Sequence, residues 1–330
     1  MRLLTIAALL WAATAAAGPA EDEKLLTAAA EGNNAVITTL LKAGANINAK
    51  DELGGTALGA ALASGKGDTA KLLLAKGADP NGGAANGQTA LAMAVFSGRT
   101  DLVKLLIDKG ADVNKKDGNG LTLLMLMASM GNEPMLSFLL GKKADVNLRG
   151  QFGMSVLQYA QQLPALRTLL GAGADPNARD DNGNTALMTQ MYGGKTDMMK
   201  AMLDAGADPN QADKNGQPLI VSAACAGKLD AVKLLLEYGA DAHDKGKGTI
   251  KAGDCAKYSG KDPELIRVLQ EAEASGPRPR SAPASTPAAA GGGGGGDVVT
   301  RLKDLQELRK SGAITEEEFQ KLKAEILGGK

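Results

Sequence analysis

Residues 77–109 read GADPNGGAANGQTALAMAVFSGRTDLVKLLIDK, and the same layout begins again at Gly110. The tripeptide Gly-Ala-Asp, or a close variant of it, recurs along most of the chain. It begins at Gly44, Gly77, Gly110, Lys143, Gly173, Gly206 and Gly239, which gives intervals of 33, 33, 33, 30, 33 and 33 residues. A nearly fixed period of this length predicts a stack of similar structural units rather than one globular core.

A second signature keeps step with the first and consists of a Thr, or its substitute, before two apolar residues. It lies at 56–58, 89–91, 122–124, 155–157, 185–187 and 218–220. The Thr is expected to cap a short helix, and a glycine such as Gly98 to end that helix in a left-handed conformation. A second helix with an apolar stripe then follows. Asn-Gly pairs such as Asn119-Gly120 predict the turns of hairpin-like loops between units.

This unit resembles the ankyrin repeat in its 33-residue period and in its Thr-Ala-Leu and Gly-Ala-Asp signatures. The resemblance implies an all-α fold in which about eight helix-turn-helix units form a solenoid over residues 21–274. It also implies a role in binding another protein rather than catalysis. The first unit begins with a helix expected at 25–30, and the last unit is more polar than the others, so we interpret both as caps.

One unit is shorter than the rest. Between Ala160 and Leu166 the chain has five residues, three fewer than the corresponding segment elsewhere, which predicts a trimmed turn between the two helices of that unit. Two interpretations stay open. The deletion is either tolerated without consequence, or it produces a local kink that shapes the partner surface near Phe152.

The first 20 residues have the pattern of an export signal. Arg2 precedes an apolar run from Leu3 to Ala13, and the small residues at 15–17 suit a signal peptidase, so the mature chain is expected to begin near Gly18. An uncleaved anchor is the alternative. The expected location is therefore secreted or periplasmic, without stable insertion into a membrane after cleavage.

The C-terminal part changes composition abruptly. Residues 275–296 are rich in Pro, Ala and Ser and end in six glycines, which predicts a flexible linker. Residues 297–330 then predict an α-helical hairpin, with a capping box that begins at Thr315. Their core, LKDLQELRKSGAITEEEFQKLKAEIL at 302–327, resembles the SHOCT domain, a short C-terminal module of many bacterial proteins. The resemblance implies a bacterial source. Self-association is the favoured role of the hairpin, with docking onto another protein or a loosely ordered tail as alternatives.

Few residues suggest chemistry. The 37 basic and 37 acidic residues balance, so the net charge gives no reason to expect nucleic acid or anionic lipid as a partner. His243 is the sole histidine and occupies a position where other units carry Asn, so neither a zinc site nor a catalytic dyad is expected. We therefore expect no cofactor and no enzymatic activity.

Sulfur-containing residues allow two further interpretations. Ten methionines lie between Met125 and Met202 and could bind copper, but their fall at apolar positions of the repeat favours core packing. Cys225 and Cys255 are expected on the first helices of adjacent units. Packed helices lie about 8–10 Å apart, whereas a disulfide needs Cα atoms within about 7 Å, so the predicted geometry disfavours a bond and leaves two thiols as the alternative.

The expected partner surface follows from the ankyrin resemblance. In such stacks the partner meets the loop tips and the exposed ends of the first helices, which line one concave face. The residues that fall there in the middle units are Phe96, Ser129, Met130, Phe152, Met154 and Tyr192. Three of the chain's 4 Phe and 4 Tyr are among them, and aromatic anchors dominate many interfaces. The alternative is that Phe96 and Phe152 fill gaps between units. An envelope structural or small-ligand-binding protein is the alternative function.

Overall fold

The structure is a computed structural model that describes residues 18–258, 262–276 and 320. Within these residues it contains sixteen α-helices, one 3-10 turn and no β-strand, which confirms the all-α expectation. Most of the predicted signal segment, and all of the predicted linker and hairpin beyond Gly276 except Gln320, lie outside the described residues. In the part that is described, no helix is both long and apolar enough to span a membrane.

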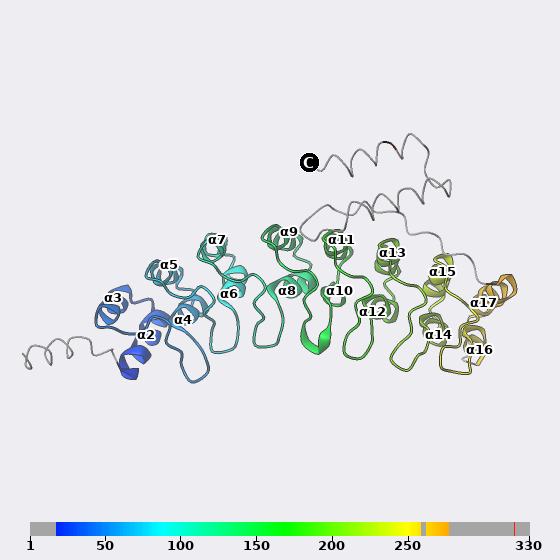
Figure 1. Ribbon diagram of the computed structural model, residues 1–330, viewed down its shortest axis with the longest axis horizontal. Coiled ribbons are helices and arrows are strands. Elements are labelled where there is room, and N and C mark those ends of the chain that lie inside the picture. Colours follow the sequence, from blue (N-terminus) through cyan, green and yellow to red (C-terminus); the bar gives the residue numbers. More distant parts are fainter. Residues whose placement is uncertain (1–17, 259–261, 277–319, 321–330) are drawn as a thin grey trace, which may run out of the picture. The chain divides into compact units, whose positions relative to one another are not determined.

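The sixteen helices form eight antiparallel pairs, which we number as units 1 to 8. The first helices of the units are α2 (Pro19–Glu31), α4 (Ala57–Ala63), α6 (Ala90–Phe96), α8 (Leu123–Met130), α10 (Val156–Tyr159), α12 (Ala186–Gly193), α14 (Leu219–Cys225) and α16 (Ala252–Tyr258). The second helices are α3 (Asn34–Lys42), α5 (Gly67–Ala75), α7 (Thr100–Asp108), α9 (Glu133–Gly141), α11 (Leu163–Gly171), α13 (Thr196–Asp204), α15 (Leu229–Glu237) and α17 (Pro263–Ser275). Figure 1 shows the first helices in a row beside the hairpin-like loops, and the second helices in a row on their far side.

The residues predicted to begin and end the first helices have these roles in the structure. The Thr89 hydroxyl accepts a hydrogen bond from the Ala92 amide at the start of α6, and Thr56, Thr122 and Thr185 cap their helices in the same way. Gly98 follows α6 with a φ of 67°, a left-handed conformation that glycine adopts without a steric penalty. The helices α4, α6, α8 and α12 therefore begin after a Thr and end before a glycine that the period marks.

The core runs the length of the stack as one continuous cluster. The first helices bury small residues such as Ala61 and Ala94, while the second helices bury leucines such as Leu73 and Leu106. Small residues let neighbouring first helices approach closely, and the leucines fill the space between the two rows. Most of the middle methionines belong to this cluster, as the core-packing interpretation predicted.

A ladder of side-chain hydrogen bonds joins consecutive units outside the core. In each rung, an Asn Oδ1 accepts a hydrogen bond from the backbone N–H of the signature Asp in the next unit, at N···O distances of 2.8–3.0 Å. The pairs are Asn48–Asp79, Asn81–Asp112, Asn114–Asp145, Asn147–Asp175, Asn177–Asp208 and Asn210–Asp241. The Gly-Ala-Asp-x-Asn motif thus serves the contact between units as well as the end of the second helix.

Unit 5 is shortened, but at a different place from the one predicted. Its first helix, α10, has 4 residues, whereas α8 and α12 on either side have 8 each. The backbone leaves the helix at Ala160, with a ψ of 120°, and stays extended at Gln162 before α11 begins with Pro164 in its first turn. Pro suits the first turn of a helix, so α11 begins here without an added residue. The turn between α10 and α11 has three residues, as does the turn between α6 and α7, so the missing residues shorten the first helix and not the turn.

Cys225 and Cys255 form a disulfide between α14 and α16, with Cα atoms 5.1 Å apart. The expectation that helix packing would hold these residues too far apart was wrong. Ala223, Ala224, Ala252 and Gly253 are buried in these two helices, and such small side chains allow a closer approach than the typical interaxial distance.

Candidate partner-binding surface

Four of the six predicted residues lie at the C-terminal ends of first helices. Phe96 ends α6, Ser129 and Met130 end α8, and Tyr192 lies in the last turn of α12. The exposed fractions of Phe96, Met130 and Tyr192 are 46%, 55% and 57%. Such values place the three large side chains at the surface rather than in gaps between units. We call Phe96, Ser129, Met130 and Tyr192 the helix-end row.

A polar side chain borders the helix-end row at Met130. Gln162, the residue directly before α11, lies back over a glycine of the preceding unit, so that a Cβ at Gly131 would lie 2.3 Å from Cδ of Gln162. Lys66 covers Gly32 in the same manner, at 3.0 Å from the added Cβ. These glycines therefore leave room for the neighbouring side chain, in addition to ending the helix. Gln162 brings an uncharged amide close to Met130.

Several charged groups near the row form ion pairs or hydrogen bonds within the stack. Arg99 donates two hydrogen bonds to the Asp101 carboxylate, which also receives Lys71 at 2.8 Å. The hydrogen bonds from Arg99 and Lys71 hold the pKa of Asp101 well below its usual range. Lys195 donates to the backbone carbonyl and to the side chain of Gln161. The row itself consists of apolar and hydroxyl-bearing side chains, with the Ser129 hydroxyl donating to the Leu126 carbonyl.

Phe152 and Met154 lie apart from this row, in the loop that leads into α10. Phe152 is 65% exposed and has a φ of 55°, which makes it one of two non-glycine residues with positive φ in the described chain. Its carbonyl accepts a hydrogen bond from the Asp181 amide of the next loop. Met154 is half-buried, and its carbonyl accepts from the Gly150 amide. The structure thus separates the six residues into the helix-end row and this unit-5 loop, at opposite ends of the first helices.

The unit-5 loop is built differently from the others. In four of the loops an Asp carboxylate accepts hydrogen bonds from two loop amides, as Asp117 does from Asn119 and Leu121. The residues in this role are Asp51, Asp117, Asp180 and Asp213. Unit 5 has Gly150 at that position, and Tyr159 of α10 occupies the adjacent space, donating a long hydrogen bond of 3.5 Å to the Gln151 carbonyl. Sequence reasoning missed this arrangement, although a Gly in place of the recurrent Asp was a visible signal.

Comparison with protein families agrees with this architecture. Residues 25–117, 114–180 and 160–245 match the family described as ankyrin repeats (3 copies), and together the matches cover more than half of the chain. The chain belongs to the ankyrin-repeat family. Residues 300–327 match the SHOCT, or short C-terminal, domain. A comparison with curated proteins gives no match. Ankyrin repeats generally mediate interactions between proteins, so the coarse expectation of a protein-binding scaffold is supported by the family.

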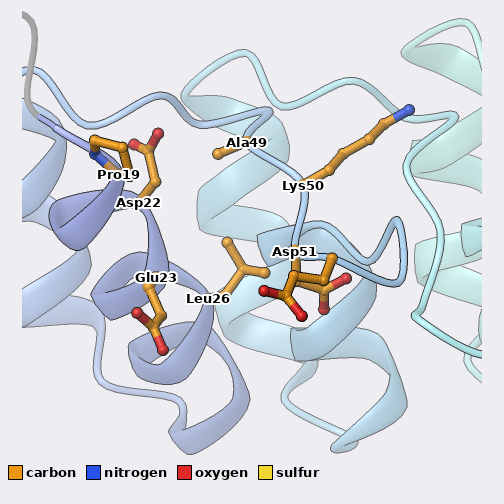
Figure 2. A pocket seen from close by; sticks show the side chains of 8 residues that line it. Pro19, Asp22, Glu23, Leu26, Ala49, Lys50 and Asp51 are labelled. Carbon is orange, nitrogen blue, oxygen red and sulfur yellow. The ribbon is translucent and has the colours of Figure 1, made fainter.

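The ankyrin stack also has a hollow of about 310 Å³ at its N-terminal end, between α2 and the first loop. Figure 2 shows Asp22 and Glu23 on one side and Asp51 on the other, with Lys50 extending away. The Asp22 carboxylate accepts the Asn46 amide, and Asp51 accepts the amides of its own loop. Because these carboxylates already satisfy backbone donors, the acidic lining has a structural explanation.

Within the described residues, no group of three or more His, Cys, Asp or Glu side chains could hold a metal ion. His243 follows the last rung of the ladder, where its amide donates to the Asp241 carboxylate and its Nδ1 lies 3.3 Å from the same group. It takes the position of Asn210 one unit further along, in keeping with the interpretation of a turn-stabilising residue.

Proposed function

We propose that this ankyrin-repeat protein is an exported scaffold of the bacterial envelope that binds a partner protein through the helix-end row and the unit-5 loop. The observation that supports this most directly is the exposure of Phe96, Met130 and Tyr192 on successive full-length first helices. Aromatic side chains that become buried in an interface often contribute most of its binding free energy. The exposure of such a side chain on a free monomer adds nothing to the stability of the fold.

Export is supported by the disulfide between Cys225 and Cys255. Disulfides persist in oxidising compartments such as the periplasm and are rare in the cytosol, where reducing systems keep thiols free. The apolar run at 3–13 agrees with this assignment, and its cleavage near Gly18 remains a prediction. Comparing the N-terminal sequence of the protein recovered from the periplasmic fraction with the encoded one would test it.

Site-directed photo-cross-linking tests the binding surface. A benzophenone amino acid placed at Phe96 or Tyr192 should yield a discrete cross-linked partner in envelope extracts. The same probe at Lys104 or Ser137, exposed residues of the second helices α7 and α9, should not. Equal yields at all four positions would contradict a site on the first-helix face, and the absence of any protein product would favour the structural or small-ligand alternative.

Truncation of the anchors gives a quantitative version of the test. Phe96→Ala and Tyr192→Ala should each weaken capture of the cross-linked partner by roughly thirtyfold, as expected when about 2 kcal/mol is lost at an interface anchor. Both variants should keep the thermal midpoint of the stack, because both side chains are exposed. A lowered midpoint with unchanged capture would identify these residues as packing elements.

Self-association is assigned in this proposal to residues 297–330. The apolar residues of the predicted hairpin recur at helical spacing, and a segment of this size cannot enclose a stable core alone. Deletion of 297–330 should lower the mass measured by analytical ultracentrifugation while the far-UV circular dichroism of the stack persists. An unchanged assembly state would leave docking onto another protein as the better assignment.

A further inference from the structure

The chain has no free thiol that could react with an oxidant, because both of its cysteines are joined in the Cys225–Cys255 disulfide. Methionine thioethers are therefore its most readily oxidised side chains in the folded stack. Their reactivity with peroxides depends on access to the sulfur atom. The burial of each methionine consequently decides where an oxidant acts.

The methionines of the described residues differ sharply in exposure. Met93, Met125, Met127, Met188, Met191, Met198, Met199 and Met202 are buried, each with an exposed fraction of 5% or less. Met135 and Met154 are half-buried. Met130, with 55% exposure, is the one exposed methionine in this part of the chain.

Met130 is also unusual for its place in the repeat. It directly precedes the glycine that ends the first helix, and the corresponding residues of the other regular units are Ser64, Ser97, Gly193 and Ala226. All of these positions are exposed, but unit 4 alone fills the position with a large apolar side chain. Since the side chain contributes little to the core, folding does not explain the choice of Met here.

The surroundings place Met130 in the middle of the candidate surface. It lies in the helix-end row between Phe96 of α6 and Tyr192 of α12, beside the Gln162 amide that covers Gly131. The next first helix, α10, ends after 4 residues, so unit 5 contributes no helix-end side chain at this point. Met130 is therefore the principal apolar side chain of the row between units 3 and 6.

We propose that Met130 is an oxidation site that controls partner binding. Hydrogen peroxide transfers one oxygen atom to the Met130 thioether, which becomes a sulfoxide, while the peroxide is reduced to water. The sulfur gives two electrons and the O–O bond breaks, so that no other reactant is needed. The sulfoxide oxygen is polar, so its burial against an apolar surface of the partner costs free energy unless it accepts a hydrogen bond. Burial of the unoxidised thioether carries no such cost. The control of binding rests on the proposed function, whereas the selectivity of oxidation does not.

Peptide mass spectrometry of the full chain after brief treatment with hydrogen peroxide tests the selectivity. Met130 should gain one oxygen roughly tenfold or more faster than Met199 and Met202, which react only when the stack opens locally. Met135 should show an intermediate rate. Equal rates at Met130 and Met199, or no reaction at Met130, would overturn the assignment of the oxidation site.

The effect on binding is measured with the benzophenone probe at Tyr192 in envelope extract. Peroxide treatment should reduce the cross-linked product about tenfold in the otherwise native chain and in a Met135→Leu control, but not in Met130→Leu. Leu keeps an apolar side chain that cannot be oxidised. Unchanged cross-linking after complete Met130 oxidation would overturn the control of binding. If the untreated chain gives no cross-linked product, the proposed function is overturned, and so is the control of binding by oxidation. The measured order of oxidation rates would still stand.

Discussion

The Tyr159 hydroxyl lies 2.6 Å from the position that a Cβ on Gly150 would occupy, and the Met125 sulfur lies 2.9 Å from the same point. Gly150 itself has ordinary extended backbone angles, so the requirement for glycine is steric rather than conformational. Tyr159 of α10 lies beside Gly150 in the unit-5 loop, where four of the other loops have an Asp carboxylate. Any side chain at Gly150 must displace either Tyr159 or Met125.

We therefore expect Gly150→Asp to lower the free energy of unfolding by about 1–3 kcal/mol, as overpacking at a closely packed site does. Urea denaturation followed by circular dichroism measures the change. Ala84→Asp is the matched control, because Ala84 holds the same position in the unit-3 loop. This position already has a Cβ and has no tyrosine beside it. The control variant should leave stability unchanged or raise it slightly by supplying the carboxylate that accepts two loop amides. A Gly150→Asp variant as stable as the control would contradict the steric argument.

Phe152 provides a second test, because its exposed side chain is held in a left-handed conformation. This conformation costs a residue with a Cβ roughly 1–2 kcal/mol, and less for Asn, which adopts it more readily. Phe152→Asn should therefore raise the free energy of unfolding by about 1 kcal/mol. The same variant should weaken cross-linking from the benzophenone at Tyr192 if the unit-5 loop touches the partner. A loss of stability would show that Phe152 packs within the stack, and unchanged cross-linking would remove the loop from the binding surface.

The period of the sequence was sufficient to predict the fold because it encodes local rules. Each Thr cap and each left-handed glycine, such as Thr89 and Gly98, acts within one turn of its own helix, so that a residue pattern specifies it directly. The exposed positions of the row followed from the same register. In this sense Phe96 and Tyr192 could be placed at the surface from the sequence, although their role in binding stays a prediction.

Features that depend on the exact approach of neighbouring elements were not predictable in this way. The disulfide exists because Ala224 and Gly253 let two helices approach more closely than a typical pair, which a standard interaxial distance could not reveal. The left-handed Phe152 lies in a loop that has Gly150 in place of the recurrent Asp and whose Gln151 carbonyl accepts a hydrogen bond from Tyr159 of the following helix. Both outcomes arise from contacts between segments rather than from the propensity of either segment alone.

The ladder between units predicts a loss of stability when one of its asparagines is removed. Asn177 Oδ1 accepts hydrogen bonds from the Asp208 amide and from Gln211 Nε2, while its Nδ2 donates to the Gly206 carbonyl. Asn177→Ala should therefore lower the free energy of unfolding by about 2 kcal/mol, since each lost bond of this kind contributes about 0.5–1.5 kcal/mol. Asn182→Ala, at the exposed tip of the adjacent loop, is the control and should change stability by less than about 0.5 kcal/mol. Thermal and urea unfolding compare the two, and similar losses would argue against a stabilising ladder.

The disulfide predicts a local effect of reduction at the C-terminal end of the stack. The last unit has a thin core, because α16 buries Ala252, Gly253 and Ala256 but no large apolar residue, and the last described rung of the ladder ends at Asp241. Terminal units of a solenoid unfold most easily because they contact a single neighbour. The bond closes a loop over a sequence separation of 30 residues, for which chain entropy gives a stabilisation of about 3.5 kcal/mol.

The Cys225→Ser, Cys255→Ser double variant, or the native chain in dithiothreitol, should therefore show faster hydrogen exchange in α16 and α17 and nearly unchanged exchange in α6 and α7. Loss of protection throughout the stack would mean that the bond supports the whole solenoid, and no change in α16 would mean that packing alone holds the last unit in place.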